Sequence, residues 1–285
     1  MKFRFIREHS ARHRVRTLCR VLGVSSSGYY AWFRRPESQR RREDRRLLHQ
    51  IRVIHRQSRR SYGSPRIHAE LRRQVFRCGR NRVARLMREE GLRAKAPRRF
   101  KVTTHSAKGH AVAPNRLDRR FEVESLDTVW GGDITYVWTG EGWLYLAVLM
   151  DLCSRRIVGW SLKERLSGEL TLEALDRALE TRQPVPGLLH HSDRGSQYTA
   201  AAYQARLRSQ GFEVSMARRG NCWDNAPLES FFATLKKDLR RGTTFATRRQ
   251  AQMAIFDYIE GFYNTRRLHS GLGYMAPAHF EARTL

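Results

Sequence analysis

The sequence predicts an α/β core built on a mixed sheet, with the element order βββαβαβα, preceded by an all-α basic helix-turn-helix region. Three observations predict this division. Residues 1–120 hold 35 Lys and Arg against 8 Asp and Glu, whereas residues 121–285 hold 20 against 19. The first part contains basic segments with the apolar spacing of helices. The second contains three aromatic and β-branched runs, after which short apolar runs alternate with helical segments.

The charge bounds the function before any motif is considered. The formal net charge of +28 indicates a polyanionic partner, nucleic acid first. A basic surface that serves solubility alone is the alternative. The N-terminus lacks the apolar stretch of a signal peptide, and the longest apolar run, over 144–150, is too short to span a bilayer. We therefore expect a cytoplasmic, nucleoid-associated chain with no membrane partner.

The remaining composition excludes several classes of site. The four cysteines show neither C-x-x-C nor Cys/His ligand spacing, so no disulfide framework or structural zinc site is expected. A P-loop motif is also missing, which argues against nucleotide hydrolysis.

The basic region is expected to begin with a helix-turn-helix over 11–35, whose two helices flank a turn at 22–25. Its aromatic side chains, Tyr29, Tyr30 and Trp32, favour a small core over base stacking. A basic amphipathic helix follows over 40–57.

Two further helices, over 65–74 and 81–94, predict a second helical DNA-binding unit, and Gly91 is expected to end the second helix. Beyond them the periodicity is lost, which predicts a basic linker that follows phosphate. The expected segments are a helix-turn-helix region over 1–60, a second helical unit over 61–95, a linker over 96–125, a catalytic core over 126–245 and a helical extension over 246–285.

The core elements follow in order. Three runs separated by short turns, over 133–138, 143–151 and 155–162, predict an antiparallel meander. The expected order after them is a helix over 168–182, a strand over 188–191, a helix over 199–210, a strand over 212–216 and a long helix from 227. This order is similar to the ribonuclease H-like fold.

Three carboxylates stand at or near the ends of these elements. Asp133 is expected at the start of the first strand, Asp193 just past the fourth, and Glu229 in the first turns of the last helix. Three oxygen donors from separate elements can hold two Mg²⁺ ions about 3.5 to 4 Å apart, the arrangement that promotes phosphodiester chemistry. Taken singly, each has an ordinary structural explanation: a strand end, a turn former before Gly195, and an acid at a helix N-terminus.

The helix that carries Glu229 adds a second indication. At 100° per residue its apolar stripe leaves Glu229 and Lys236 together on one flank. That arrangement suits a carboxylate facing metal and an ammonium facing DNA phosphate. A solvated pair is equally consistent with the spacing.

The segments "WGGDITYVWT", "YLAVLMDLCSRRIVGW", "HHSDRGSQYT", "WDNAPLESFFATLKKDL" and "YNTRRLHSGLGYMAPAHFE" resemble, in order and spacing, bacterial insertion-sequence transposases of the retroviral-integrase-like DDE group. "YGSPRIHAELRR" and "RVARLMREEGLRAK" resemble the helical region that precedes that core. The resemblance implies a downstream-frame catalytic product of a two-frame element, with Asp133, Asp193 and Glu229 as catalytic residues and metal ligands. The sequence departs from the family pattern at Val75 and Phe76, where a glycine-containing turn is expected.

The resemblance further implies Mg²⁺-dependent strand cleavage and strand transfer at the ends of an insertion sequence, with two ions and Mn²⁺ as a substitute. The partners would be terminal-repeat and target DNA, further copies of the chain on DNA, and the upstream-frame product. Basic side chains are expected to line the DNA groove near the metals: Arg194, Lys236, Lys237, Arg240 and Arg241. Trp223 is expected either to stack on a base or to be buried.

Other interpretations remain open at this point. A structure-selective nuclease on the same fold and a DNA-binding regulator with an inactive core are the alternatives. Asp151 and Asp224 compete as carboxylates. Asp151 precedes a tight turn, and Asp224 or Asn225 is placed to cap the last helix, so both are expected to be structural.

Overall fold

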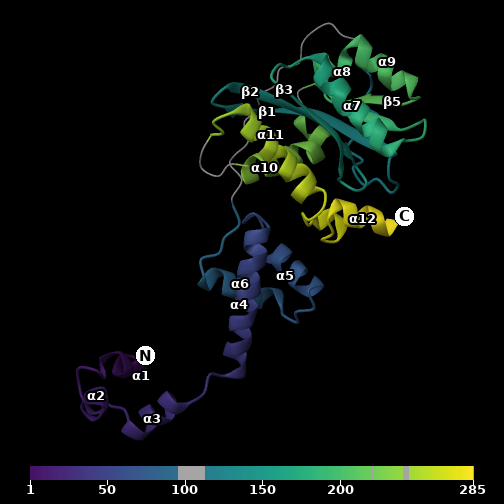
Figure 1. Ribbon diagram of the computed structural model, residues 1–285. Helices are drawn as coiled ribbons and strands as arrows, with labels where there is room; N and C mark the ends of the chain where they lie inside the picture. The colour runs from purple at the N-terminus through teal and green to yellow at the C-terminus, as the bar shows by residue number, and fades with distance from the viewer. Residues whose placement is uncertain (96–112, 220, 240–243, 285) are drawn as a thin grey trace. The chain divides into compact units, whose positions relative to one another are not determined.

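The computed structural model describes residues 1–95, 113–219, 221–239 and 244–284. Contacts divide the chain into two compact units, Met1–Val53 and Ile54–Leu285. Predicted Arg240 and Arg241 and most of the expected linker lie outside the described residues. Figure 1 shows the elements of each unit.

The first unit begins with three short helices. They are α1 (Lys2–His9), α2 (Val15–Val21) and α3 (Ser26–Arg34), of which α1 was not expected from the sequence. Gly23 adopts φ +59° in the turn, and the Ser25 hydroxyl accepts a hydrogen bond from the Gly28 amide at the start of α3. Ile6, Cys19 and Tyr29 form the core, with Trp32 packed against it, whereas Tyr30 is exposed.

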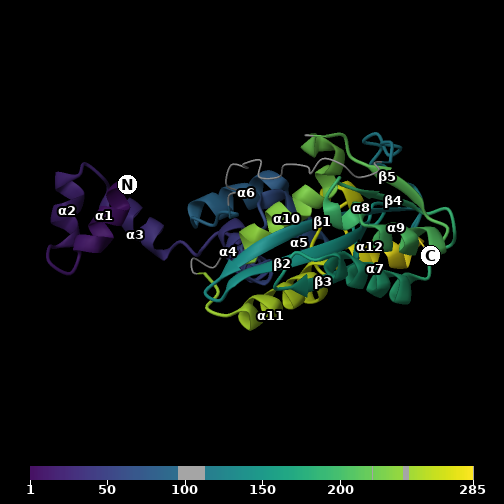
Figure 2. The same cartoon turned by 90° about the horizontal axis from the view of Figure 1, so that it is seen from above.

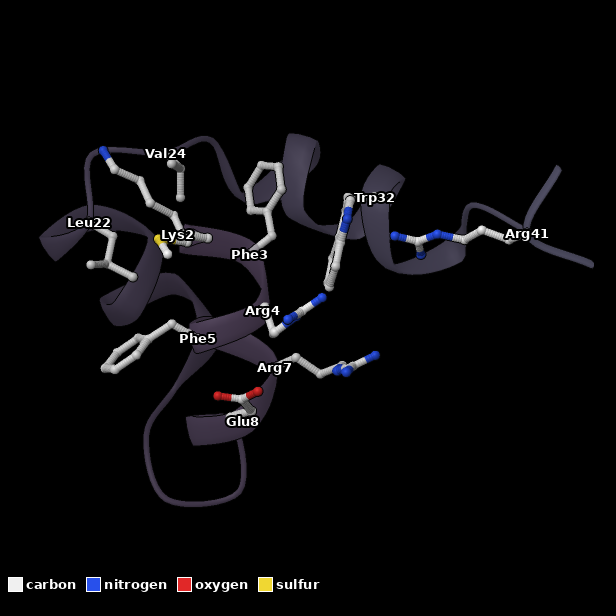
Figure 3. A pocket seen from close by; sticks show the side chains of 11 residues that line it. Lys2, Phe3, Arg4, Phe5, Arg7, Glu8, Leu22, Val24, Trp32 and Arg41 are labelled. Carbon is white, nitrogen blue, oxygen red and sulfur yellow. The ribbon is translucent and has the colours of Figure 1, made fainter. Parts of the chain in front are cut away.

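A surface pocket of this unit is bounded by basic and aromatic side chains (Figure 3). Two of these side chains are in contact: the Arg7 guanidinium lies 5.8 Å from the ring centroid of Trp32. The residues around the pocket are Met1, Lys2, Phe3, Arg4, Phe5, Arg7, Glu8, Leu22, Val24, Trp32 and Arg41. None of the predicted catalytic carboxylates belongs to this pocket.

The helix α4 (Gln39–Gln57) contains the division between the two units. Beyond it, α5 (Ser64–Arg73) and α6 (Arg80–Glu89) bear out the two predicted helices, and Gly91 follows α6 with φ +65°. Val75 takes φ +65° after α5, at the position where a glycine was expected. A β-branched residue is strained in that region of backbone conformation, so the chain has the turn without the residue that best suits it.

The core is a five-stranded sheet in the order β3-β2-β1-β4-β5. The antiparallel meander is β1 (Val129–Thr139), β2 (Gly142–Asp151) and β3 (Ile157–Lys163). The strands β4 (Leu189–Ser192) and β5 (Glu213–Met216) add in parallel on the other side of β1. With the helices between them, these strands confirm the predicted order βββαβαβα.

Helices cover both faces of this sheet (Figure 2). On one face α7 (Gly168–Arg182) approaches β3 so closely that a Cβ on Gly159 would lie 2.2 Å from the Ala174 carbonyl oxygen. The helix predicted over 199–210 is divided into α8 (Ser196–Thr199) and α9 (Ala201–Ser209). The helices α10 (Ala226–Leu239) and α11 (Arg248–Tyr258) both contact β1.

The C-terminal segment connects the sheet to the α5–α6 helices. It continues from α11 through the π-helical turn η2 (Ile259–Tyr263) to α12 (Pro277–Thr284). The Asn264 amide makes two 3.0 Å hydrogen bonds to the backbone of Ile157 at the edge of the sheet. The Tyr62 hydroxyl accepts from the Leu268 amide at 2.7 Å, and Arg59 pairs with Asp257. Residues 54–95 are therefore anchored on the core.

Residues 113–125, the end of the expected linker, also contact the core. The amides of Arg116 and Leu117 donate to the Ser215 hydroxyl on β5 at 2.9 and 3.1 Å. The expected domain boundaries remain predictions. Among the described residues, no helix combines the length and apolar character needed to cross a membrane.

Candidate active site

Asp133 is the fifth residue of β1, near the middle of the strand, and not at the strand's beginning as the sequence suggested. The strand extends further towards its N-terminus because Val129 to Gly132 pair with β4 on one side and Trp130 to Gly132 with β2 on the other. The amide of Ile134 donates to the Asp133 carboxylate at 2.7 Å. The side chain is half-buried, so solvent or a ligand can reach it.

Asp193 directly follows β4, as predicted. Gly132 pairs with Ser192 in the parallel ladder. Asp133 and Asp193 are the residues that follow this pair in the two neighbouring strands. The amide of Gly195 donates to the Asp193 carboxylate at 2.9 Å, a local turn that orients it. Both aspartates therefore lie at one position across the sheet, where the β4 pairing of β1 stops.

Glu229 is in the first turn of α10, also as predicted. Its helix can approach β1 because Gly131 has no side chain: a Cβ there would lie 2.7 Å from Leu228 Cδ1 and 3.2 Å from Leu152 Cδ2. The Asn225 amide group donates to the Gly132 carbonyl at 3.4 Å, one residue before Asp133. A glycine and an asparagine thus hold the start of α10 against the strand that carries the first aspartate.

The turn before α10 is fixed by Asp224. Of the two residues expected to cap the helix, Asp224 or Asn225, Asp224 uses its carboxylate to bind arginines instead. Its fully buried carboxylate accepts from the guanidinium groups of Arg119 and Arg218, both at 2.8 Å at their closest. These hydrogen bonds, those of Arg218 first, hold the pKa of Asp224 far below its ordinary value. The expectation that Asp224 is structural is therefore supported, but its role is that of an ion-pair centre.

His191 ties the same turn to β4. Its Nε2 donates to the Asp224 carbonyl at 3.0 Å, and Nδ1 accepts from the Ser215 hydroxyl at 2.8 Å. These partners require one protonated and one bare ring nitrogen. Burial lowers the pKa of His191 to about 4, so the ring is neutral at physiological pH.

The three carboxylates carry an excess of negative charge. Burial raises the pKa of Asp133 well above its ordinary value, and the charges of Asp193 and Glu229 raise it further. The Ile134 amide and the Lys236 ammonium oppose this rise. Burial also raises the pKa of Asp193 and of Glu229. The effects of Asp193 and Glu229 on Asp133 agree with the backbone pairing and helix packing that bring the three groups together from three different elements.

This donor set suits a divalent cation. Half-buried carboxylates are hard oxygen ligands, and a cation between them would relieve the repulsion that raises the pKa of Asp133. Within the part of the chain that the structure describes, no three His, Cys, Asp or Glu side chains already meet the spacing of a formed metal centre. The fit is therefore one of charge and ligand type.

Lys236 lies beside this site, two turns after Glu229 on α10. Its Nζ is 4.9 Å from the ring centroid of Tyr136, three residues beyond Asp133 on β1. The electrostatic effect of Lys236 on Asp133 agrees with the helical flank that the sequence predicted for Lys236 and Glu229. The contact between Tyr136 and Lys236 was not predicted, because the alternation of side chains along a strand does not indicate which of them a distant lysine will contact.

The other predicted DNA-contacting residues are more scattered. The Arg194 guanidinium donates to the Ala217 carbonyl at 2.7 Å and is half-buried. Lys237 lies near Arg66, Lys95 and Arg267. Burial first, and these cations after it, lower the pKa of Lys237 although Asp238 raises it. Trp223 is 67% exposed, so its predicted burial is wrong and stacking remains open.

Asp151 is structural, as expected. It accepts from the Ser154 amide at 2.7 Å within its own turn and from the Asp127 amide at 2.8 Å. The Ser154 hydroxyl donates to it as well, at 2.9 Å, so both carboxylate oxygens have donors within the fold.

Comparisons with known proteins agree with this architecture. Residues 125–222 and 210–277 match the integrase core domain family, and residues 41–100 match the HTH-like domain family. The HTH-like match thus covers α4 to α6, and not the helix-turn-helix expected over 11–35.

Two curated relatives cover most of the chain. It is 40% identical to the transposase InsF for insertion sequence IS3A of Escherichia coli (strain K12), with 100% of both chains covered. It is 45% identical over 266 residues to the insertion element IS600 uncharacterized 31 kDa protein of Shigella sonnei, which covers 93% of this chain and 98% of that protein. Among solved structures, the HTLV-2 integrase catalytic core domain in complex with magnesium is 15% identical, with 54% of this chain and 95% of that chain covered and a TM-score of 0.43.

Proposed function

The chain belongs to the insertion-sequence transposases that carry an integrase core domain, and from this we propose that Asp133, Asp193 and Glu229 form its catalytic centre. Its activity is DNA transposition. The observation that carries the assignment is geometric: Asp133 and Asp193 continue from paired residues of β1 and β4, and Gly131 lets the start of α10, which carries Glu229, pack against β1. The charges of Asp193 and Glu229 also raise the pKa of Asp133.

We infer that these carboxylates hold divalent cations, two Mg²⁺ ions with Mn²⁺ as a substitute. Such ions supply activation of the attacking oxygen and neutralise charge on the phosphodiester. The chain's own contribution is geometric. Asp133 and Asp193 are held by the backbone of adjacent strands, and Glu229 is held by the contact of α10 with Gly131.

The reaction that we propose has two stages at each end of the element. Water attacks first, and the liberated 3′-hydroxyl then attacks target DNA. The first stage hydrolyses one phosphodiester, and the second exchanges one phosphodiester for another. Neither stage requires nucleotide hydrolysis. Lys236 is proposed to bind a phosphate beside the reacting bond, as a point charge on the Glu229 flank of α10.

The DNA partners that we propose are the terminal repeats and the target. The HTH-like segment 41–100 and the high positive charge of the N-terminal part support binding of the repeats. We further propose that the chain acts as an oligomer on DNA, and that the product of an upstream frame is a partner, because the sequence resembles two-frame elements.

The test is to incubate the purified chain with labelled terminal-repeat duplexes, with and without Mg²⁺. Cleaved ends and strand-transfer products that require the metal are expected. Cleavage without joining of a pre-cleaved end would favour a structure-selective nuclease. DNA binding without any cleavage would favour a regulator with an inactive core.

A further inference from the structure

Three exposed aromatic rings form a strip on the β1–β2 hairpin. Tyr136 is 38% exposed, Trp138 is 51% exposed and Trp143 is 43% exposed. Trp138 and Trp143 are paired across the two strands with ring centroids 4.7 Å apart, and Trp143 lies 4.9 Å from Tyr136. A cross-strand pair of this kind stabilises a hairpin, but it does not require that the rings remain exposed.

One end of the strip lies beside Lys236, whose ammonium is 4.9 Å from the Tyr136 ring centroid. Alternation along β1 directs Tyr136 and Asp133 to opposite faces of the strand, so Lys236, which also acts on Asp133, is the group that links the strip to the proposed catalytic centre. From there the rings continue through Trp143 to Trp138 near the end of the hairpin. The β4 pairing of β1 ends at Gly132, so Tyr136 and Trp138 lie on the part of β1 that extends beyond β4, and Trp143 lies opposite Trp138 on β2 (Figure 2).

Exposed aromatic surface next to a cation fits one kind of ligand particularly well. A nucleotide offers both a phosphate for the ammonium and a flat base for the rings. Bases inside a duplex have both faces covered by their neighbours, so a ring can stack only on a base that has left the stack. A strip beside Lys236 therefore suits DNA that is locally unpaired.

We propose that the Tyr136–Trp143–Trp138 strip binds unpaired nucleotides of the element end next to the cleaved bond. This inference rests on the proposed function, because it takes the carboxylate site as the place where the end is cut. It adds a substrate property: the enzyme favours an end whose terminal bases are open over one that is fully paired.

The experiment measures binding in EDTA, so that no cleavage occurs. The probes are two terminal-repeat duplexes, one fully paired and one with mismatched terminal nucleotides that carry 2-aminopurine. Wild-type protein is expected to bind the open end about tenfold more tightly, because stacking on an aromatic side chain contributes on that order per base. Quenching of 2-aminopurine fluorescence on binding reports the stacking directly.

Trp138→Ala and Trp143→Ala should bring the preference for the open end to about twofold or less and remove the quenching, whereas Trp138→Phe should retain both. Because the readout is a ratio of two affinities of one sample, partial unfolding of a variant does not alter it. Phe256→Ala is the matched control. That ring is also exposed and in the same unit, but it packs against Trp160.

An unchanged preference in Trp138→Ala would overturn the inference. So would a dimer of the DNA-free protein that the same substitution dissolves, since the strip would then be a protein interface. Cleavage of paired ends by wild-type protein with Mg²⁺ is measured in parallel. Its absence would count against the proposed function, whereas its presence with an unaltered preference would count against the strip alone.

Discussion

Asp133 and Asp193 follow directly after Gly132 and Ser192, the last paired residues of the parallel strands β1 and β4. Two carboxylates are thereby brought to one place by backbone pairing, and each also accepts a local amide hydrogen bond. Their positions do not depend on flexible side chains finding each other. Without a cation, the neighbouring negative charges make ionisation of Asp133 less favourable.

Asp133→Asn, Asp193→Asn and Glu229→Gln should each lower cleavage and strand transfer at least about a hundredfold, since even groups that only orient a metal ligand contribute tenfold to a hundredfold. Binding of terminal-repeat DNA should remain within about threefold of wild type, because affinity comes mainly from the basic segments. Gel-shift and cleavage assays on the same samples separate the two effects. Retained cleavage in any variant would remove that residue from the centre.

The raised pKa of Asp133 predicts a specific pH dependence of stability. In the unfolded chain this group titrates near its ordinary value, so between that value and the folded pKa the folded state binds more protons. Without metal, the free energy of unfolding should therefore rise as pH falls through the folded pKa, and this contribution should level off below the ordinary pKa of an aspartate.

The difference in melting temperature between wild type and Asp133→Asn isolates this contribution. In EDTA, Asp133→Asn should melt higher than wild type at neutral pH, and the difference should shrink in acid. Saturating Mg²⁺ should raise the melting temperature of wild type more than that of the variant. A difference that is independent of both pH and metal would contradict the electrostatic account.

Lys236→Ala should lower strand transfer and weaken binding of the element end, whereas Lys236→Arg should keep much of both. Because Lys236 lies off the apolar stripe of its helix, the sequence alone predicts that Lys236→Ala lowers the free energy of unfolding by less than about 0.5 kcal/mol. The contact with the Tyr136 ring raises that expectation to about 0.5 to 1 kcal/mol, the usual range for an exposed cation–π pair. Thermal melts and strand-transfer assays on both variants measure the two effects together. Full activity in Lys236→Ala would return the lysine to a solvated surface role.

Asp224→Asn should destabilise the protein by about 1 to 3 kcal/mol, because two arginines lose a buried partner while both remain partly in contact with water. The stabilisation belongs to the ionised form, whose pKa is lowered by folding. It is present above the ordinary pKa of an aspartate and lost as pH falls towards the folded value. Denaturant unfolding of wild type and Asp224→Asn at neutral pH gives the size. A loss below about 0.5 kcal/mol would show that the ion pairs are not needed to hold the turn before α10.

The sequence predicted the order of elements because strands and helices differ in apolar period, and it placed Asp193 and Glu229 correctly relative to their elements. It did not predict Asp133 in mid-strand, since the β4 partner that extends β1 is 60 residues away. Asp224 or Asn225 was expected to cap a helix, and the ion pairs of Asp224 were missed, one of them with Arg119, 105 residues earlier, and one with Arg218 across the intervening turn. Contacts of this range have no local sequence signal, and they are the ones that complete the site.

Gly131→Ala adds one methyl group where α10 packs against β1, so this substitution tests how α10 is positioned. The added Cβ would lie 2.7 Å from Leu228 Cδ1, so the helix must shift or the leucine must repack, at a cost of about 1 to 3 kcal/mol. Glu229 follows Leu228 on α10. Cleavage by Gly131→Ala should therefore be slower than that by wild type even at temperatures where the variant is fully folded.

Gly168→Ala is the control: a Cβ there meets nothing within 4 Å, and alanine favours the helix that begins at this residue. The double variant Gly131→Ala/Leu228→Ala restores space at the contact, so the two stability losses should be less than additive. Strictly additive losses, or full activity in Gly131→Ala, would show that this contact does not set the position of Glu229.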